Sequence, residues 1–354
     1  MNLTFDREAL LGAVDAVVNK TMEMDLQWSW PCGVAYYGVA RAAEAAGRED
    51  YYDYLKARVD EHRGLGLPAW NVNACAMGYA VLTLYQKTGD EAYLALVNSK
   101  RDYLLGSALR FGEGVLQHTV SSDNDFPEQA WADTLFMAAY FMLRAGVALG
   151  DKALIEDALN QYFWHIEYLQ NKENGLWYHG YDNTDKANGG HMSGFHWGRA
   201  NAWAAYTMSR VKDTLPEPYL YPPYMQIDCS LRDQLTGLKK LQAPDGLWRT
   251  LLDDAESYGE VSATAGIGAA MINNNNPLHT AYAQKALDAV LANISPDGRV
   301  LNVSGGTAVM KDREGYMNIP RTWTQGWGQG LALALLSSAL EPGAASDAVS
   351  VSKQ

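Results

Sequence analysis

The sequence of 354 residues predicts an all-α fold, an (α/α)6 barrel in which six helical hairpins form a two-layer toroid with short β-hairpins at one rim. Helix-length apolar segments recur along the chain, and each is paired with an amphipathic helix across a polar turn. These apolar runs are too long for strands and lack period-two alternation. Residues 1–340 are therefore expected to form one domain, and the small, polar residues 341–354 a flexible C-terminal tail.

The first helix of each pair is apolar nearly all round, as in LFMAAYFML (135–143), and such a helix must be covered on every side. The second carries a polar stripe, as in KALDAVLANI (285–294), which suits an outer surface. An open helical solenoid is the alternative, but it would need capping repeats that the sequence does not show. The six predicted hairpins cover residues 33–55, 76–96, 133–169, 198–241, 262–294, and 326–340 with the opening helix 5–20 as its partner.

Short turns followed by β-prone residues come after several of the second helices, which predicts small hairpins at one rim of the barrel. Each of these segments leads into the next inner helix. Side chains far apart in the chain are therefore expected to meet at one mouth: His118, Asp133, His179 and Arg249. The predicted hairpin segments are 112–120, 173–182, 244–254 and 296–306.

Composition excludes several classes of protein. With 28 Lys and Arg against 41 Asp and Glu, the net charge is −13, which argues against nucleic acid and anionic membrane as partners. No stretch approaches the roughly 20 apolar residues of a membrane span. The opening MNLTFDREAL lacks the basic and apolar regions of a signal peptide, so a cytoplasmic protein is expected. Cys32, Cys75 and Cys229 occur singly and are interpreted as buried thiols rather than a disulfide framework.

Aromatic residues with a polar group predominate, with 11 Trp and 21 Tyr against 7 Phe. Such rings stack on sugar faces and hydrogen-bond at their edges, although they are also ordinary core residues. Arg199 lies between Trp197 and Trp203, where it suits bidentate binding of a carboxylate or, alternatively, a structural stack on tryptophan. His179, in WYHGYD, has either a hydrogen-bonding or a structural role.

Asp133 stands at the start of an apolar helix among aromatic residues, where a carboxylate is costly unless it has a partner or a task. One interpretation is a first-turn Asp that gains from the helix dipole. The other is a general acid whose pKa is raised by burial. The two move the pKa in opposite directions, and the sequence does not choose between them.

No metal or cofactor is expected. His191 and His196 are five residues apart, which does not put them on one helical face, and no HExxH signature occurs. The glycines of GIGAAM (266–271) and GWGQG (326–330) open helices without a βαβ context, so they indicate close helix packing rather than a dinucleotide loop.

The segments FPEQAWADTLFMA, NGLWYHGYD, WGRANAW, DGLWRTLLDDAESYGEVSATAG, DGRVLNVSGGT and WGQGLALALL occur in this order. Over roughly residues 28–340 the chain resembles glycoside hydrolase family 105, the unsaturated rhamnogalacturonyl and glucuronyl hydrolases. The resemblance implies an (α/α)6 catalytic domain. It also implies a substrate that is a small lyase-generated oligosaccharide with a Δ4,5-unsaturated uronic acid at its non-reducing end. An acid protonates C4, water adds at C5, and the hemiketal collapses.

The resemblance assigns Asp133 as the catalytic acid. Two positions depart from the family pattern: Asn73 stands where some relatives have a second Asp, and Ala200 replaces a glycine. Ser262 and Thr264 are either hydroxyl donors to the uronate or helix caps. The full set of implied substrate-binding residues is Trp30, Tyr36, Asn73, His118, His179, Trp197, Arg199, Trp203, Ser262 and Thr264.

Two alternatives stay open at this point. The first is a sugar epimerase or isomerase of the same toroid fold, with His118 and His179 as acid and base across the barrel. The second is a non-catalytic carbohydrate-binding protein that uses the Trp and Arg cleft.

Overall fold

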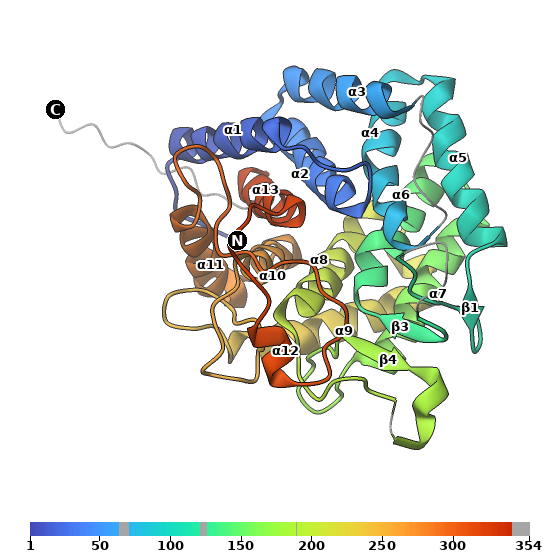
Figure 1. The fold of residues 1–354 in the computed structure, drawn as a ribbon. Helices are drawn as coiled ribbons and strands as arrows, with labels where there is room; N and C mark the ends of the chain where they lie inside the picture. Colours follow the sequence, from blue (N-terminus) through green and yellow to red (C-terminus); the bar gives the residue numbers. More distant parts are fainter. Residues whose placement is uncertain (64–70, 121–125, 189, 342–354) are drawn as a thin grey trace.

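The computed structural model describes residues 1–63, 71–120, 126–188 and 190–341, and shows the predicted toroid of two helical layers (Figure 1). Apart from Glu341, the predicted tail 341–354 lies outside the described residues. The inner layer consists of α2 (Trp30–Ala46), α4 (Gly78–Thr88), α6 (Tyr140–Leu149), α8 (Gly198–Thr214), α10 (Val261–Asn274) and α13 (Gly326–Leu340). The outer layer consists of α1 (Arg7–Glu23), α3 (Glu49–Arg63), α5 (Glu91–Gly106), α7 (Lys152–Leu169), α9 (Pro222–Lys239) and α11 (Thr280–Ala292).

The inner helices form a closed ring, because α2 packs on α4, α4 on α6, α6 on α8, α8 on α10, α10 on α13, and α13 again on α2. Each inner helix also packs on the outer helix of its predicted pair, with α1 beside α13. Ring closure excludes the open solenoid, which has two free ends.

The hairpin turns have simple chemistry. The inner helices α2, α4 and α6 end at Gly47, Gly89 and Gly150, whose positive φ angles of 65°, 68° and 67° suit glycine. Asp90 and Asp151 follow two of them directly and cap α5 and α7 by accepting backbone N–H hydrogen bonds. The predicted Gly-centred turn is thus a helix C-cap joined to an Asp N-cap.

Small residues let the inner helices approach closely. A Cβ on Gly330 of α13 would lie 2.1 Å from the Val34 oxygen of α2, and one on Gly38 would lie 2.5 Å from the Gly330 oxygen. On α10, a Cβ on Gly266 would lie 2.8 Å from the Ala202 Cβ. The glycines of GWGQG and GIGAAM therefore serve close packing, as predicted.

The rim differs in part from the prediction. β1 (Arg110–Phe111) and β2 (Val115–Leu116) form a hairpin as expected. However, β4 (Gly180–Asp182) pairs not within its own segment but with β3 (Gln129–Trp131), about fifty residues earlier. The segments 244–254 and 296–306 form only isolated bridges such as Arg249↔Gly259 and Ile294↔Val300, because strands this short carry no alternation that fixes their partner.

Short helical turns complete the rims. One of them, η2 (Leu135–Ala139), is π-helical and directly precedes α6. The short helix α12 (Arg313–Met317) lies in the long segment between α11 and α13 (Figure 1). The remaining 3-10 turns are η1 (Asn73–Met77), η3 (Asn183–Asn188), η4 (Pro218–Leu220) and η5 (Pro277–His279).

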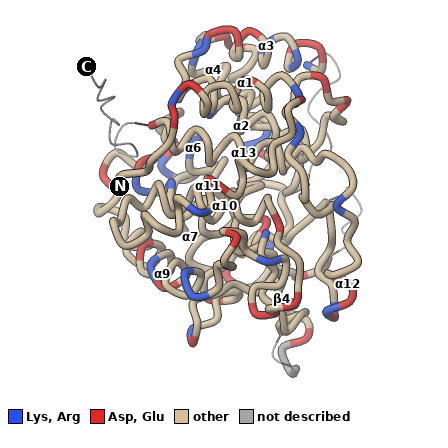
Figure 2. The backbone as a smooth tube through the Cα atoms, turned by 90° about the vertical axis from the view of Figure 1, so that its left-hand side faces the viewer, with Lys and Arg blue, Asp and Glu red and all other residues tan. Residues whose placement is uncertain are grey.

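Charged residues lie mainly on outer helices and rim loops, for example along α3 and α9 (Figure 2). Among the helices over the described ranges, none combines the length and apolar character of a membrane span. Cys32 and Cys75 are buried, but Cys229 is exposed, so the expectation of a buried thiol is wrong there. Cys229 lies on an outward-facing position of α9, an outer helix with one polar face.

Candidate active site

A cavity of about 290 Å³ opens at the end of the barrel where the inner helices begin. Its walls come from the start of α2, from η1, from the turn between β3 and η2, from the first turns of α8, and from residues 306–308. It brings together seven of the predicted site residues: Trp30, Asn73, His118, Asp133, Trp197, Arg199 and Trp203.

The β3–β4 ladder places Asp133 beside His179. Trp131 is paired with Gly180, and the Ala132 N–H donates to the His179 carbonyl over 3.0 Å. The residues that follow Ala132 and precede Gly180 therefore meet at the end of the ladder. Asp133 Oδ2 lies 3.3 Å from His179 Nε2, at ion-pair distance, and both atoms are buried without a hydrogen bond of regular geometry among the described residues.

The protonation of Asp133 depends on competing influences. Burial is the largest single influence and raises its pKa, but the hydrogen bond from His179 and the positive charge of Arg199 help to outweigh burial. The pKa of Asp133 is thus held below its ordinary value. The direction matches the first of the two interpretations from sequence, although a histidine causes much of it rather than the helix dipole alone.

His118 contributes an uncharged ring to the cavity. It stacks on Trp131 with centroids 4.4 Å apart, and its Nδ1 lies 2.9 Å from the Thr134 hydroxyl. Burial lowers the pKa of His118 to about 4, so the imidazole is neutral near pH 7. It is suited to hydrogen bonding rather than to charge stabilisation.

Arg199 is mostly occupied by the protein itself. Its Nη1 donates to the Ser304 carbonyl over 2.9 Å, its Nη2 donates to the Gly305 carbonyl over 2.7 Å, and Nη1 lies 3.7 Å from buried Glu260. The guanidinium also stacks on Trp197, 4.4 Å from the ring centroid. These contacts occupy Nη1 and one N–H of Nη2, so the structural interpretation of Arg199 accounts for most of its donors.

Several cavity residues carry polar atoms that the protein does not satisfy. The indole N–H groups of Trp197 and Trp203 and the Oδ1 of Asn73 are buried and have no hydrogen-bond partner among the described residues. Trp30 adds an aromatic wall and stacks on Trp327 with centroids 4.7 Å apart. Two donors and an acceptor beside aromatic faces are the groups that a sugar ring engages.

Five other predicted residues lie outside the cavity wall, and one of them, His179, contacts Asp133 from there. Tyr36 is buried against Tyr54, and Arg249 donates to the Ser257 carbonyl. The Ser262 hydroxyl donates to the Glu260 carboxylate, and the Thr264 hydroxyl donates to the Glu260 carbonyl. Neither residue caps α10, because the N-cap is Glu260; both hydroxyls instead donate to this capping residue from inside the helix.

Sequence reasoning missed three residues that support the site. Glu260, fully buried, caps α10 and faces Arg199. Tyr316 on α12 reaches His179, with its hydroxyl 2.9 Å from Nδ1. Thr307 lines the cavity from the 301–325 segment. Glu260 and Thr307 belong to segments that the sequence singled out for the family resemblance, but Tyr316 does not, because no periodicity marks a residue of an irregular loop.

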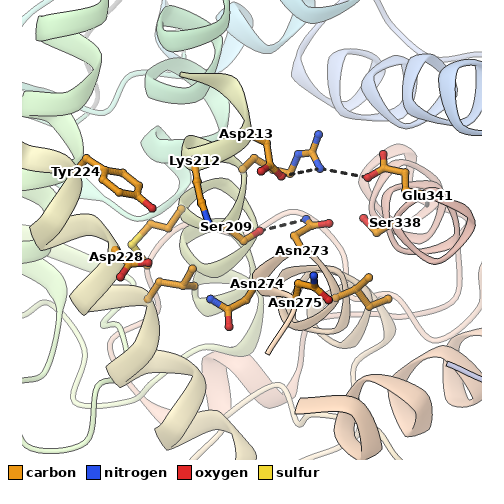
Figure 3. A pocket seen from close by; sticks show the side chains of 14 residues that line it. Ser209, Lys212, Asp213, Tyr224, Asp228, Asn273, Asn274, Asn275, Ser338 and Glu341 are labelled. Atoms are coloured by element: carbon orange, nitrogen blue, oxygen red, sulfur yellow. Dashed lines mark hydrogen bonds and ion pairs between the residues drawn. The ribbon is translucent and has the colours of Figure 1, made fainter. Parts of the chain in front are cut away.

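A second cavity of about 330 Å³ lies at the opposite end of the barrel, where α8, α10 and α13 end (Figure 3). It is polar, and its charges are largely paired: Arg210 lies 3.5 Å from Glu341 and 3.8 Å from Asp213. Asn273 donates to the Ser209 hydroxyl. None of the predicted site residues lines this cavity. The described residues contain no group of three His, Cys, Asp or Glu side chains placed to hold a metal ion.

A closed helical toroid with a tryptophan-walled cavity at one end is typical of carbohydrate-active enzymes, and comparison with known proteins gives the class of this one. The model of Glycosyl Hydrolase Family 88 matches residues 8–341, so the chain belongs to this family and is a glycoside hydrolase.

Similar proteins agree with the resemblance seen in the sequence. The chain is 48% identical over 340 residues to the unsaturated rhamnogalacturonyl hydrolase YesR of Bacillus subtilis, covering 96% of this chain and 97% of the relative. A solved structure of a possible family 105 member from Salmonella enterica has a TM-score of 0.88 at 27% identity, covering 95% of this chain and 94% of that one. The unsaturated glucuronyl hydrolase of Bacillus sp. GL1 shares the fold, with a TM-score of 0.69 at 17% identity over 95% of this chain and 96% of that one.

Proposed function

We propose that this enzyme removes the Δ4,5-unsaturated uronic acid from the non-reducing end of small oligosaccharides that a polysaccharide lyase has produced. The observation that carries the proposal is the Asp133–His179 pair at the base of the tryptophan-walled cavity. The 48% identity to a relative named an unsaturated rhamnogalacturonyl hydrolase supports it. This relationship favours hydrolysis over the epimerase and the carbohydrate-binding alternatives.

The proposed reaction is a hydration followed by collapse. The lowered pKa of Asp133 leaves its carboxyl ionised in the free enzyme near pH 7. When the negatively charged substrate displaces water from the cavity, Asp133 takes up a proton from solvent, which it then donates to C4 of the vinyl ether. The resulting cation at C5 takes the oxygen of a water molecule, whose proton returns to Asp133. The C5 hemiketal opens, and the hemiacetal left at C1 expels the neighbouring sugar as an alcohol. One carboxyl performs both proton transfers, so the distance rules for pairs of glycosidase carboxylates do not apply.

Other residues of the cavity have supporting roles in this proposal. Asn73 does not titrate, so its free Oδ1 orients the water or a ring hydroxyl instead of acting as a second acid. The indole N–H groups of Trp197 and Trp203 donate to sugar oxygens, and Trp30 provides a stacking face.

Asp133→Asn tests the catalytic assignment. We expect kcat to fall by roughly 10²–10⁴-fold, the usual contribution of a general acid, with little change in melting temperature. The assay follows the loss of ultraviolet absorbance as the double bond of an unsaturated disaccharide is consumed. Asp182→Asn is a matched control: this carboxylate ends the same ladder but lies outside the cavity wall, so activity should be unchanged. Near-normal turnover by Asp133→Asn would overturn the assignment.

The neighbouring sugar is the finer part of the proposal. The relationship to a rhamnogalacturonyl hydrolase favours rhamnose next to the uronate. We expect kcat/KM to be higher for an unsaturated disaccharide ending in rhamnose than for one ending in glucose or an amino sugar. Equal values for the three substrates would contradict this preference.

A further inference from the structure

Tyr316 extends the Asp133–His179 pair to a third residue. Its hydroxyl lies 2.9 Å from His179 Nδ1, while Nε2 on the other side of the ring lies 3.3 Å from Asp133 Oδ2. All three belong to different parts of the chain: the turn after β3, the residue before β4, and α12. Tyr316 and His179 are fully buried, so this row of contacts is shielded from water.

The groups on either side of the His179 ring fix the direction of its hydrogen bond with Tyr316. Burial raises the pKa of Tyr316 well above the ordinary value for tyrosine, so the phenol keeps its proton. On the other side of the ring, His179 Nε2 faces the Asp133 carboxylate across 3.3 Å, and a carboxylate oxygen needs an N–H donor there rather than a second lone pair. The proton of the neutral ring therefore belongs on Nε2, and the Tyr316 O–H donates to His179 Nδ1 over 2.9 Å.

An imidazole that accepts at Nδ1 carries its proton at Nε2. We propose that Tyr316 is a positioning residue that holds His179 with its Nε2–H directed at Asp133, a role that rests on the proposed catalytic function of Asp133. When Asp133 gives its proton to C4, negative charge develops on the carboxylate. The Nε2–H is already in place to stabilise that charge, as a preorganised donor does in an oxyanion hole.

Neighbouring residues fix the position of Tyr316. The Tyr258 hydroxyl donates to the Tyr316 carbonyl over 3.3 Å, and Arg313 on the same short helix forms an ion pair with Asp254. The Tyr316 ring stacks beside Trp197 with centroids 6.0 Å apart. Because these contacts do not use the hydroxyl, Tyr316→Phe removes the hydrogen bond to His179 and keeps the packing.

Tyr316→Phe should change the pKa of Asp133 in a direction that can be stated in advance. Its other charged or titratable neighbours are His118 on the β3 side and Arg199 on α8, and neither is altered by the substitution. Without a fixed Nε2–H, the Asp133 carboxylate is less stabilised and its pKa rises. A weaker acid with a less stabilised conjugate base protonates C4 more slowly, so the plateau rate falls while the alkaline limb of the kcat/KM profile moves to higher pH.

The experiment is a double-mutant cycle on the unsaturated disaccharide with Tyr316→Phe, His179→Asn and both together. Removal of one stabilising donor typically costs 10²-fold or more, so we expect roughly a 10²-fold loss of kcat for His179→Asn and, for the indirect Tyr316→Phe, about a 10-fold loss with KM nearly unchanged. The double variant should be no slower than His179→Asn, because Tyr316 acts only through that ring. Tyr258→Phe, the matched control, removes a hydroxyl that anchors the same helix without touching His179 and should keep the wild-type pH profile.

The tautomer is measured directly by ¹⁵N NMR of histidine-labelled protein, with His179→Asn assigning the ring. Wild type should show the Nε2-protonated form and Tyr316→Phe a mixture of tautomers. Additive losses in the cycle, or an unchanged tautomer in Tyr316→Phe, would overturn the role of Tyr316. Failure of the proposed function is distinct, because it appears as turnover by Asp133→Asn whatever Tyr316 does.

Discussion

Arg199 is a buried charge whose main partners belong to the protein. It is 2% exposed, faces a fully buried Glu260, and donates to two carbonyls of the segment that forms one cavity wall. Breaking such a pair leaves an uncompensated charge in the interior. Arg199 therefore supports both the stability of the barrel and the shape of the cavity.

Arg199→Ala should lower the free energy of unfolding by about 3 kcal/mol, because Glu260 loses its counter-charge. It should also raise KM, since the wall formed by residues 304–308 loses its anchor. Urea denaturation and initial-rate kinetics measure the two effects. Arg249→Ala is the matched control: this half-buried arginine donates to the Ser257 carbonyl and has no ion pair with a carboxylate among the described residues, so a loss of about 1 kcal/mol is expected. Equal stability losses would contradict the importance of the buried pair.

Individual residues were predictable from sequence where a pattern surrounded them. The cost of a carboxylate among aromatic residues marked Asp133, and the aromatic-rich WGRANAW segment marked Trp197 and Trp203. The hydrogen bonds that Arg199 makes within the protein were not predictable, because its acceptors are backbone carbonyls about a hundred residues away. Tyr316 left no signal either, since its role depends on where an irregular loop crosses the rim.

At the scale of elements, apolar periodicity predicted helices and their pairing well but short strands poorly. An inner helix such as α13 is buried along its whole length, so its all-round apolar character follows directly from its position. A three-residue strand such as β4 has no comparable pattern, and its pairing with β3 is decided by tertiary placement. This non-local ladder, unseen in the sequence, is what joins His179 to Asp133.

The close crossing of α2 and α13 predicts that an added methyl group there destabilises the protein. Gly330→Ala puts a methyl group 2.1 Å from the Val34 oxygen, so the helices must separate, and we expect a loss of about 3 kcal/mol or more in unfolding free energy. Gly12→Ala is the matched control, because Gly12 lies within α1 with nothing within 4 Å of its added Cβ. It should stabilise the protein by about 0.5–1 kcal/mol. Similar effects of the two substitutions on urea midpoints would show that the helix crossing is not tight.

At the scale of the whole molecule, the closed ring of inner helices has two ends that carry different kinds of side chains. The inner helices all begin at the rim that holds the Asp133 cavity, and they end at the rim where Arg210 and Glu341 pair (Figure 3). One end therefore presents unpaired polar atoms and aromatic faces, while the other presents largely paired charges. The hairpin repeat predicted the ring itself, because six apolar helices cover one another fully only when the first meets the last.

Three buried histidines make the free energy of unfolding depend on pH. Burial lowers the pKa of His118, His165 and His279 each to about 4, below the ordinary 6.5. Between pH 4 and pH 6.5 the unfolded chain binds more protons at these histidines than the folded chain does. Their contribution to the free energy of unfolding is therefore complete above pH 6.5 and is lost as the pH falls toward 4. Carboxyls with a lowered pKa, such as Asp253, titrate below this range and do not obscure it.

His165→Asn isolates one of these contributions away from the cavity. The imidazole Nδ1 lies 2.8 Å from the Gln161 carbonyl, a contact that an Asn side-chain N–H can replace, whereas the titration is removed. Each buried histidine contributes a slope of up to about 1.4 kcal/mol per pH unit. We therefore expect the unfolding free energy of the wild type, from urea titrations at pH 7, 6 and 5, to fall steeply, and that of His165→Asn to fall less steeply by about this amount per unit. Parallel slopes for the two proteins would mean that the His165 ring takes up its proton in the folded state as readily as in the unfolded chain.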